Sequence, residues 1–208
     1  MEKPPQPMGV REIAKKGGIN PGWVSQVIQR LEELNYLVRA EEERVKLVRA
    51  QHLIEDWVEF YKYKKNNLHQ YYCHAKDGVE IVEKLKKVQI PKGLAYALSI
   101  QGGAYLISPH AVFQEVHIYL PGNPDERIKA ISFWEKALRL EKMERSGNIF
   151  LMEPYYHYSV FYGKREVKGL NVVSDIQLYL DLRKYPLRGE EQAEHLFNKK
   201  IKPLLEKR

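Results

Sequence analysis

The sequence contains a single cysteine, Cys73, among its 208 residues. It can therefore form no disulfide bond within the chain, and nothing in it indicates an oxidising compartment. It also lacks any uninterrupted apolar run of the roughly 18 residues that a membrane-spanning helix needs. The first residues, MEKPPQPMGV, do not contain the apolar core of a signal peptide. These absences predict a cytoplasmic protein with no membrane partner.

Several catalytic and cofactor-binding motifs are absent as well. The chain has no phosphate-binding glycine loop, no dinucleotide-binding glycine pattern, no GxSxG elbow and no HExxH metal motif. Cys73 and His74, with His69 nearby, lack the paired ligands that a zinc site requires. We therefore expect no catalytic residue, no metal site and no cofactor.

One acidic pattern leaves an alternative open. Glu153 is followed by Glu166 and, shortly after it, Lys168, an order that loosely matches metal-dependent nucleases. In such a site, carboxylates on adjacent strands hold Mg²⁺ while a lysine stabilises charge. An acid and a lysine at this spacing are also common in a chain that is rich in both. A nuclease with a DNA-targeting domain therefore stays as an alternative function.

The chain is basic overall. It has 34 lysines and arginines against 27 acidic residues, a formal net charge of +7 and a pI near 9.2. Such a balance favours an anionic partner such as nucleic acid. Both signs are interspersed, however, and a solvated lysine-rich surface explains the charge equally well. The charge supports nucleic-acid binding only in combination with a motif.

Residues 8–50 follow the order of a winged helix-turn-helix. A short helical pattern ends at Gly17-Gly18, and Asn20 and Pro21 then provide the N-cap and first residue of a second helix. Alternating residues on either side of an acidic turn predict a two-stranded hairpin, the wing. Apolar residues at spacings of three and four predict the buried stripe of the second helix, which comprises Val24, Val27, Ile28, Leu31 and Leu34.

The opposite face of this second helix carries side chains that can pair with base edges. Gln suits adenine, Arg suits guanine and Ser suits either, while basic residues around the helix suit phosphates. The acidic hairpin tip, Glu41 to Glu43, would instead repel phosphate. A winged-helix domain that binds protein rather than DNA is a second alternative. The predicted DNA contacts are Trp23, Ser25, Gln26, Gln29 and Arg30 on the helix, Lys15 and Lys16 before it, and Arg39, Arg44 and Lys46 on the hairpin.

Beyond the hairpin, the sequence predicts an amphipathic helix over residues 51–63, with Ile54, Trp57, Val58 and Tyr61 on its apolar stripe, and a linker, KYKKNNLHQYY. The rest alternates helix and strand patterns, in which GLAYALSIQGGAYLI reads as helical and Asn123 and Ser174 cap later helices. The helix after Asn123 is predicted to bury Ile128, Ile131, Phe133 or Trp134, and Leu138. The predicted fold class is α+β, a mixed α/β chain in which a winged helix-turn-helix precedes a domain of helices on a mixed sheet. We predict a winged-helix domain at 1–50, a connecting helix and linker at 51–75, and a C-terminal α/β domain at 76–208.

The C-terminal domain is similar to a known family. The segments GLAYALS and GGA, VHIYLP, RSGNIFLMEP and VVSDIQLYLDLRKYPLRGEEQAEHL together resemble the AbiEi antitoxin family, the transcriptional regulators of type IV toxin–antitoxin systems. The resemblance extends over nearly the whole chain, with its weight in residues 94–200. Its most specific positions are Ser174, Gln177, Leu178, Tyr179, Asp181, Leu182, Arg188, Gly189, Glu191, Ala193 and Leu196.

The resemblance implies a winged-helix reader of operator DNA that represses its own operon. It also implies a C-terminal domain that counteracts a nucleotidyltransferase-like toxin, with or without a stable complex. The roles of the motif residues stay open, and on physical grounds they are equally well explained as fold determinants. These residues are Gln177, Tyr179, Asp181, Arg188 and Glu191.

The sequence departs from the family at its start. Family members usually have a further helix before the equivalent of VREIAKK, where this chain has MEKPPQP. Without that helix, the apolar faces of residues 10–14 and 24–34 need another cover. The helix at 51–61, a second chain in a homodimer, or residues lost from a truncated gene start could supply it. The sequence leaves these three alternatives open.

Overall fold

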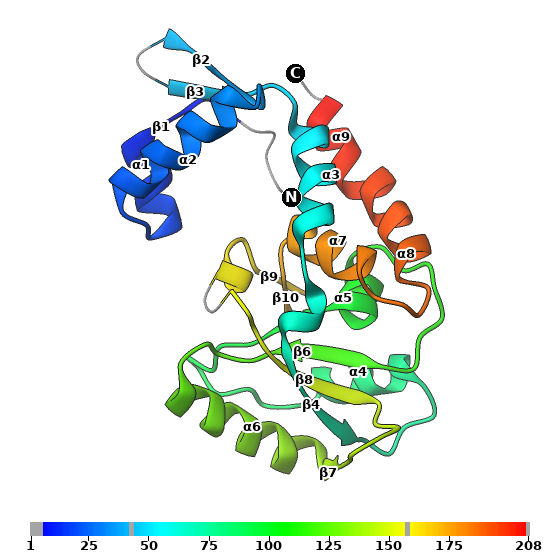
Figure 1. The fold of residues 1–208 in the computed structure, drawn as a ribbon. Helices are drawn as coiled ribbons and strands as arrows, with labels where there is room; N and C mark the ends of the chain where they lie inside the picture. Colours follow the sequence, from blue (N-terminus) through cyan, green and yellow to red (C-terminus); the bar gives the residue numbers. More distant parts are fainter. Residues whose placement is uncertain (1–5, 42–43, 157–158, 207–208) are drawn as a thin grey trace. The chain divides into compact units, whose positions relative to one another are not determined.

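The computed structural model describes residues 6–41, 44–156 and 159–206, and Figure 1 shows its helices and strands. The chain is α+β and separates into two compact units. The first unit runs up to Phe60 and takes in the chain from Lys200 onward, and the second is Tyr61–Lys199. No helix within the described ranges is both long and apolar enough to span a bilayer.

The first unit combines short helices with a small antiparallel sheet of order β1-β3-β2. The predicted β2–β3 hairpin is present, and Met8, paired with Val45, adds a strand that was not predicted. Gly18 adopts a φ of 62° after α1, and the Asn20 side chain accepts a hydrogen bond from the Gly22 amide at 2.7 Å, as the turn and cap predict. The elements are β1 (Met8–Gly9), α1 (Val10–Gly17), α2 (Pro21–Glu33), β2 (Leu37–Arg39), β3 (Arg44–Leu47), α3 (Ala50–Phe60) and α9 (Lys202–Glu206).

The apolar stripe predicted for α2 is only partly buried. Val24 and Ile28 enter the core, but Val27 and Leu34 are 52% and 42% exposed, so the prediction of their burial is wrong. Trp57 of α3, which was also predicted to be buried, is 45% exposed. The reason is that α1 and the small sheet pack on one side of α2 only. The buried core here consists of Ala14, Val24, Ile28 and Val45.

The second unit is built around a mixed seven-stranded sheet of order β7-β4-β8-β6-β5-β10-β9, in which β6–β8 and β5–β10 are parallel pairs. Its strands are β4 (Asn67–Tyr72), β5 (Ala97–Ser99), β6 (Val116–Tyr119), β7 (Glu141–Lys142), β8 (Ile149–Glu153), β9 (Arg165–Val167) and β10 (Leu170–Val172). Its helices are η2 (Tyr63–Lys65), α4 (Gly78–Lys86), α5 (Ile100–Ile107), α6 (Pro124–Leu138), η3 (Ser159–Phe161), α7 (Asp175–Arg183) and α8 (Gly189–Leu196), and a π-helical turn, η4 (Phe197–Ile201), follows α8.

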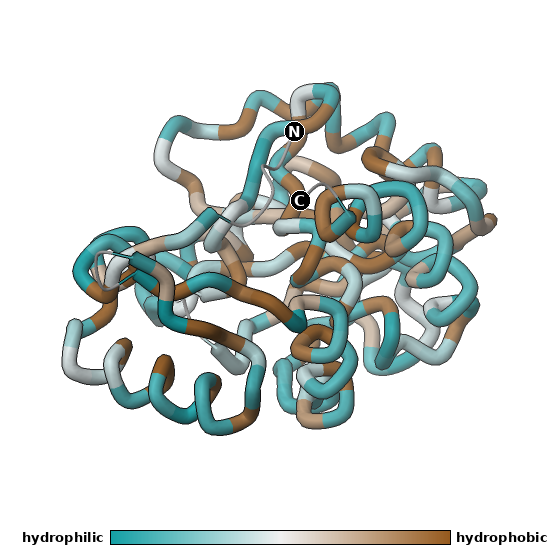
Figure 2. The backbone as a smooth tube through the Cα atoms, turned by 90° about the horizontal axis from the view of Figure 1, so that it is seen from above, coloured by the Kyte–Doolittle hydropathy of each residue, from teal (hydrophilic) through white to brown (hydrophobic). Residues whose placement is uncertain are grey.

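Alternation along the strands gives this sheet two different faces. One face is apolar: Leu98, Ile118 and Leu151 form one cluster with Leu85 of α4 and Trp134 of α6, all fully buried. Figure 2 shows hydrophobic and hydrophilic residues alternating along the helix turns, as expected for helices that pack on a sheet. The main core of the protein lies on this face.

The opposite face carries polar side chains although it is buried too. Ser99 and His117 are paired across β5 and β6, as are Ala97 and Tyr119, and all four side chains are buried. Burial of a polar side chain is unfavourable unless it finds a hydrogen-bond partner. Ser99 and Tyr119 find such partners on α7, whereas His117 Nδ1 has none among the described residues.

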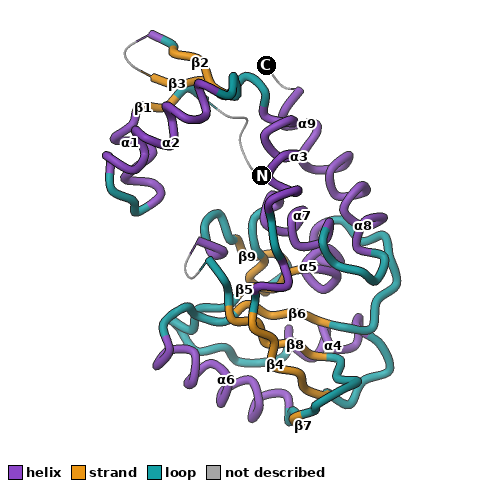
Figure 3. The backbone as a smooth tube through the Cα atoms, in the orientation of Figure 1, coloured by secondary structure: helices purple, strands orange, loops and turns teal. Residues whose placement is uncertain are grey.

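The segment KYKKNNLHQYY, which was predicted to be a linker, is part of this sheet. It forms η2 and β4, and β4 pairs with β8 from Asn67↔Glu153 to Tyr71↔Ile149. Figure 3 shows β4 as a strand beside β8. The predicted linker is therefore wrong, because a polar composition concealed a strand with only one well-buried residue, Tyr71.

Helix starts were easier to predict than buried faces. Asn123 caps α6 and Ser174 caps α7 through their side-chain oxygens, as predicted. Ile128 of α6, predicted to be buried, is 63% exposed, whereas Trp134, one of the two alternatives predicted for its core position, is fully buried. The stretch GLAYALSIQGGAYLI, predicted to be helical, contains the strand β5 ahead of α5, because periodicity cannot distinguish so short an apolar strand from a helix.

Candidate nucleic-acid interface and buried carboxylate cluster

The outer face of α2 carries the polar residues that were predicted to contact bases. Ser25, Gln26, Gln29 and Arg30 are all exposed. Their spacing places them on one side of the helix, away from the core residues of α2. The structure therefore brings these four side chains together on an accessible surface.

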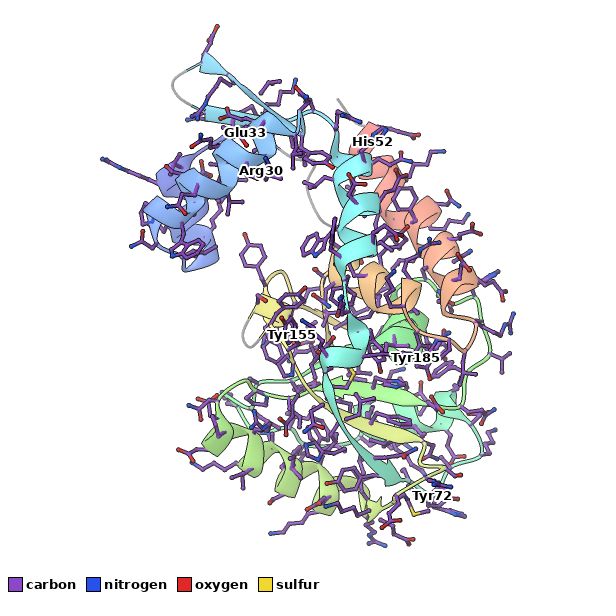
Figure 4. All side chains as sticks on the ribbon, viewed as in Figure 1. Arg30, Glu33, His52, Tyr72, Tyr155 and Tyr185 are labelled. Carbon is purple, nitrogen blue, oxygen red and sulfur yellow. The ribbon has the colours of Figure 1, made fainter. Side chains whose placement is uncertain are left out.

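One acid competes for two of these side chains. Glu33, one turn further along α2, pairs with Arg30 at 2.9 Å and accepts a hydrogen bond from Gln29 at 3.4 Å. Figure 4 shows Arg30 and Glu33 on α2. Both partners of the ion pair are at least half exposed, and such surface pairs typically contribute less than about 1 kcal/mol. Arg30 can therefore exchange Glu33 for a phosphate or a base at small cost.

Trp23 does not cap the core of the first unit, because its side chain is 66% exposed. It lies beside an apolar groove of about 390 Å³ within this unit. The groove runs along the uncovered side of α2. Its apolar lining residues are Met8, Ile13, Ile19, Trp23, Val24, Val27, Ile28, Leu31, Leu37, Val45, Leu47 and Leu53.

The hairpin divides its predicted phosphate contacts between two faces. Arg44 and Lys46 flank the buried Val45 on β3, so both project from the outer face of the strand. Arg39 is paired directly with Val45 across the ladder and therefore lies on the other face. There its guanidinium pairs with Glu32 of α2 at 2.6 Å. The structure keeps Arg44 and Lys46 together and separates Arg39 from them.

The end of α1 contributes two exposed lysines, Lys15 and Lys16. Lys16 pairs with Glu12 one turn earlier, at 2.8 Å. At the hairpin tip, Glu41 is exposed, while the other two glutamates, at 42–43, lie outside the described residues. Lys15 and Lys16 thus lie just before the turn that leads into α2.

The second unit contains a buried carboxylate, Asp181 of α7, with no measurable solvent exposure. It lies on the polar side of the sheet, and its hydrogen-bond donors come from β5, β6, α7 itself and the segment after α3. Its two oxygens accept from Tyr61, from Ser99 at 2.5 Å, from Tyr119 at 3.0 and 3.2 Å, and from Gln177 at 3.1 Å. The carboxylate is therefore fully satisfied although it is excluded from water.

Burial raises the pKa of Asp181 from 3.8 to about 6, while hydrogen bonds from Ser99, Tyr61, Tyr119 and Gln177 oppose the shift. Burial, together with the charge of Asp181, raises the pKa values of Tyr61 and Tyr119. Both phenols therefore stay protonated and act as donors at neutral pH. This arrangement ties α7 to the sheet and does not supply a reactive group.

The remaining motif residues lie elsewhere. Tyr179 is nearly buried and packs against Phe197, with 5.4 Å between ring centroids. Arg188 and Glu191 form an exposed two-pronged ion pair at 2.7 and 2.8 Å. Of the five motif residues, only Gln177 and Asp181 come together in one cluster.

Three members of this cluster were not predicted from the sequence: Tyr61, Ser99 and Tyr119. The spacing of Gln177 and Asp181, one helical turn apart, was the clearest indication of a shared site. Ser99 offered a weaker indication, since it places a hydroxyl in an otherwise apolar strand, and Tyr119 lies in a strand that also contains the polar His117. Tyr61 offered none, because it was assigned to the apolar stripe of the preceding helix.

The alternative nuclease arrangement is not assembled. Glu153 of β8 contacts His69 at 2.6 Å and Arg127 at 3.2 Å. Glu166 lies on β9, four strand positions away in the sheet, which corresponds to roughly 19 Å. Lys168 occupies the β9–β10 turn with a φ of 51°. Within the described part of the chain, no group of three potential metal ligands converges, at these residues or around Cys73.

The chain is similar to a known protein family. A family model described as "Transcriptional regulator, AbiEi antitoxin, Type IV TA system" matches residues 46–202. This range takes in α3, the whole sheet of the second unit and the buried carboxylate cluster, but it begins after α1 and α2. No curated protein and no solved structure matches the chain.

Proposed function

The chain belongs to the AbiEi antitoxin family of transcriptional regulators of type IV toxin–antitoxin systems, and we propose that it binds operator DNA through α2 and represses its own operon. The observation that carries this proposal is the exposed face formed by Ser25, Gln26, Gln29 and Arg30. These side chains have the donors and acceptors that read base edges in a major groove. The order helix, glycine turn, helix and hairpin supports a winged helix-turn-helix.

In this proposal, α2 is the recognition helix and the outer face of β3 is the wing contact. Gln26 and Gln29 pair with bases, and Arg30 leaves Glu33 to reach a base or a phosphate. Lys15, Lys16, Arg44 and Lys46 neutralise phosphates and set the register of the protein on the duplex, and Trp23 packs against sugar. Arg39 contributes less, because Glu32 holds its guanidinium on the other face of the hairpin.

The test is a salt series on binding to duplex DNA from upstream of the operon, followed by fluorescence anisotropy. We expect affinity to fall steeply with salt. In a plot of log affinity against log salt concentration, each phosphate contact should add roughly 0.9 to the magnitude of the negative slope. The double variant Gln26→Ala with Arg30→Ala should bind the operator at least tenfold more weakly, since each well-placed base contact contributes about 1–3 kcal/mol to binding.

The matched control is Gln114→Ala with Lys129→Ala, which removes the same kinds of side chain from exposed positions of the second unit. This control should bind like the unmodified protein. Salt-independent binding, or an unchanged affinity after the α2 substitutions, would contradict the proposal.

We further propose that the second unit counteracts a nucleotidyltransferase-like toxin, with or without a stable complex. Family membership supports this role. Co-expression with the toxin of the same operon should restore growth, and the α2 variant should still do so if the two functions are separate. Failure of the unmodified chain to restore growth would count against the toxin partner.

The apolar groove favours homodimer formation through the first unit as an addition to DNA binding. Ile19, Trp23 and Val27 are each more than half exposed along it, and exposed apolar surfaces of this kind commonly mark protein contacts. Sedimentation should show a dimer that Val27→Ser converts to a monomer. A monomeric unmodified protein at tens of micromolar would exclude this contact.

A further inference from the structure

A second surface with nucleic-acid chemistry lies within the second unit, apart from α2. It consists of Lys62, Lys65, Tyr155 and Tyr156, hereafter the Tyr–Lys face. Tyr155 and Tyr156 are 45% and 38% exposed and adjacent in the chain, so they present two partly open rings side by side. The lysines come from the segment around η2 and the tyrosines from the end of β8, so the face joins two distant parts of the chain. Figure 4 labels Tyr155.

One of the lysines, Lys65, is in direct contact with the Tyr155 ring. Lys65 Nζ lies 4.4 Å from the centroid of the Tyr155 ring and donates to its hydroxyl at 3.0 Å. The hydrogen bond from Lys65, with the nearby charge of Lys62, lowers the pKa of Tyr155. The two tyrosine rings meet edge to face at 4.9 Å. Positive charge therefore lies directly beside two aromatic rings that are partly exposed.

The lysines of this face are not engaged in ion pairs among the residues that the structure describes, although Glu59 lies three residues before Lys62 in the chain. Lys62, Lys64 and Lys65 form no ion pair there, and all three are exposed. The acid closest in sequence to the tyrosines, Glu153, is already engaged by His69 and Arg127. The face therefore keeps its positive charge available for an anionic partner.

The face is held rigid from below by the buried carboxylate cluster. Asn66 accepts a hydrogen bond from the Tyr155 amide at 2.9 Å and donates to the Tyr119 hydroxyl at 3.3 Å. The Tyr156 ring stacks on Tyr61 at 6.0 Å and 23°, and the Tyr61 hydroxyl donates to Asp181. Rings that are fixed in advance lose little conformational entropy when a base stacks on them. This connection gives the motif residue Asp181 a positioning role.

We propose that the Tyr–Lys face binds single-stranded nucleic acid, with bases stacked on Tyr155 and Tyr156 and phosphates held by Lys62 and Lys65. Exposed aromatic rings beside uncompensated lysines are the recurring chemistry of single-strand binding, in which stacking tolerates any base and charge follows the backbone. A duplex offers its bases only at their edges, so it cannot stack on these rings. The activity is independent of operator recognition by α2.

The test measures anisotropy of fluorescein-labelled U20 and dT20 with the full-length protein, with a 20-bp duplex of unrelated sequence as reference. We expect at least one single strand to bind about tenfold or more tightly than that duplex at moderate salt. Tyr155→Ala with Tyr156→Ala should lower single-strand affinity by about tenfold or more, because stacking on each ring is lost. Tyr155→Phe, which keeps the ring, should retain binding.

Replacing Lys62→Gln with Lys65→Gln should reduce the log–log salt slope by about 1.4, because two phosphate contacts on a single strand are lost. Two matched controls should leave binding unchanged: Tyr72→Ala for the rings, and Lys129→Gln with Lys136→Gln on α6 for the charge. Circular dichroism and melting of each variant confirm that it is folded.

The variant with Gln26→Ala and Arg30→Ala separates this inference from operator binding. It should lose operator affinity and keep single-strand affinity. Single-strand binding that fails in this α2 variant, that survives the loss of both tyrosine rings in a folded protein, or that is no tighter than binding of the unrelated duplex would overturn the assignment.

Discussion

Helices α2 and α7 carry similar polar residues, but those of α2 are exposed to solvent and those of α7 are buried. In α2, Gln26 and Gln29 point into solvent; in α7, Gln177 and Asp181, also one turn or less apart on a helix, close a buried network. The difference lies in what covers each helix. α7 packs between the polar face of the sheet and α8, whereas α1 and a small sheet cover α2 on one side only. A polar helix face is a candidate interface only when no other element of its own unit covers it.

The cores of the two units differ in the same way. The first unit buries one small cluster around Val24 and Ile28, while the second buries a continuous core around Trp134. Small cores give marginal stability, so the first unit gains more from a partner that covers its groove. The second unit can accommodate a buried carboxylate because its apolar face already supplies a large core.

The largest expected effect tests the buried polar residues of α7. Asp181→Ala leaves the hydroxyls of Tyr61, Ser99 and Tyr119 without their acceptor, and an unsatisfied buried donor costs roughly 1–3 kcal/mol. We expect a loss of about 4 kcal/mol in the free energy of unfolding, measured by urea denaturation with tryptophan fluorescence.

The control for this prediction is Ser25→Ala with Gln26→Ala in α2. These are polar truncations on an exposed helix face, and they should change stability by no more than about 0.5 kcal/mol. Equal losses in the two variants would mean that burial does not distinguish the two polar faces.

The sequence allowed helix starts to be predicted better than buried contacts. The caps at Asn20, Asn123 and Ser174 depend on a few neighbouring residues, so local rules identified the helix starts. The partners of Asp181 come from positions as distant as Tyr61, and no local pattern encodes contacts across 120 positions of the chain. The strand β4 was missed for a related reason: its burial is decided by its neighbours in the sheet, β7 and β8, and not by its own composition.

A smaller effect follows from the titration of Asp181. Its pKa in the folded chain is about 6, above its ordinary 3.8, so the folded state binds the proton more tightly than the unfolded state. The protonated carboxyl therefore contributes stability that is fully present below about pH 4 and is lost as pH rises through about 6. A shift of this size corresponds to a loss on the order of 3 kcal/mol.

Asp181→Asn isolates this contribution, because the amide does not titrate while the other groups of the protein still do. The difference in unfolding free energy between the unmodified chain and Asp181→Asn should decline between pH 4 and pH 6.5, measured by urea denaturation at each pH. A difference that stays constant over this range, or one that grows with pH, would mean that the hydrogen bonds to Asp181 outweigh its burial.

The smallest expected effect tests the exposed cations of the β2–β3 hairpin. Lys46 projects from the outer face of β3, whereas Arg39 lies on the other face and pairs with Glu32 at 2.6 Å. Lys46→Gln should therefore reduce the log–log salt slope of operator binding by about 0.9, the value for one phosphate contact. Arg39→Gln also removes one positive charge, but from the neighbouring strand β2, and it should leave the slope unchanged. Equal reductions in the two variants would show that Arg39 leaves Glu32 when DNA binds, and that the face of the hairpin does not decide which cations reach phosphate.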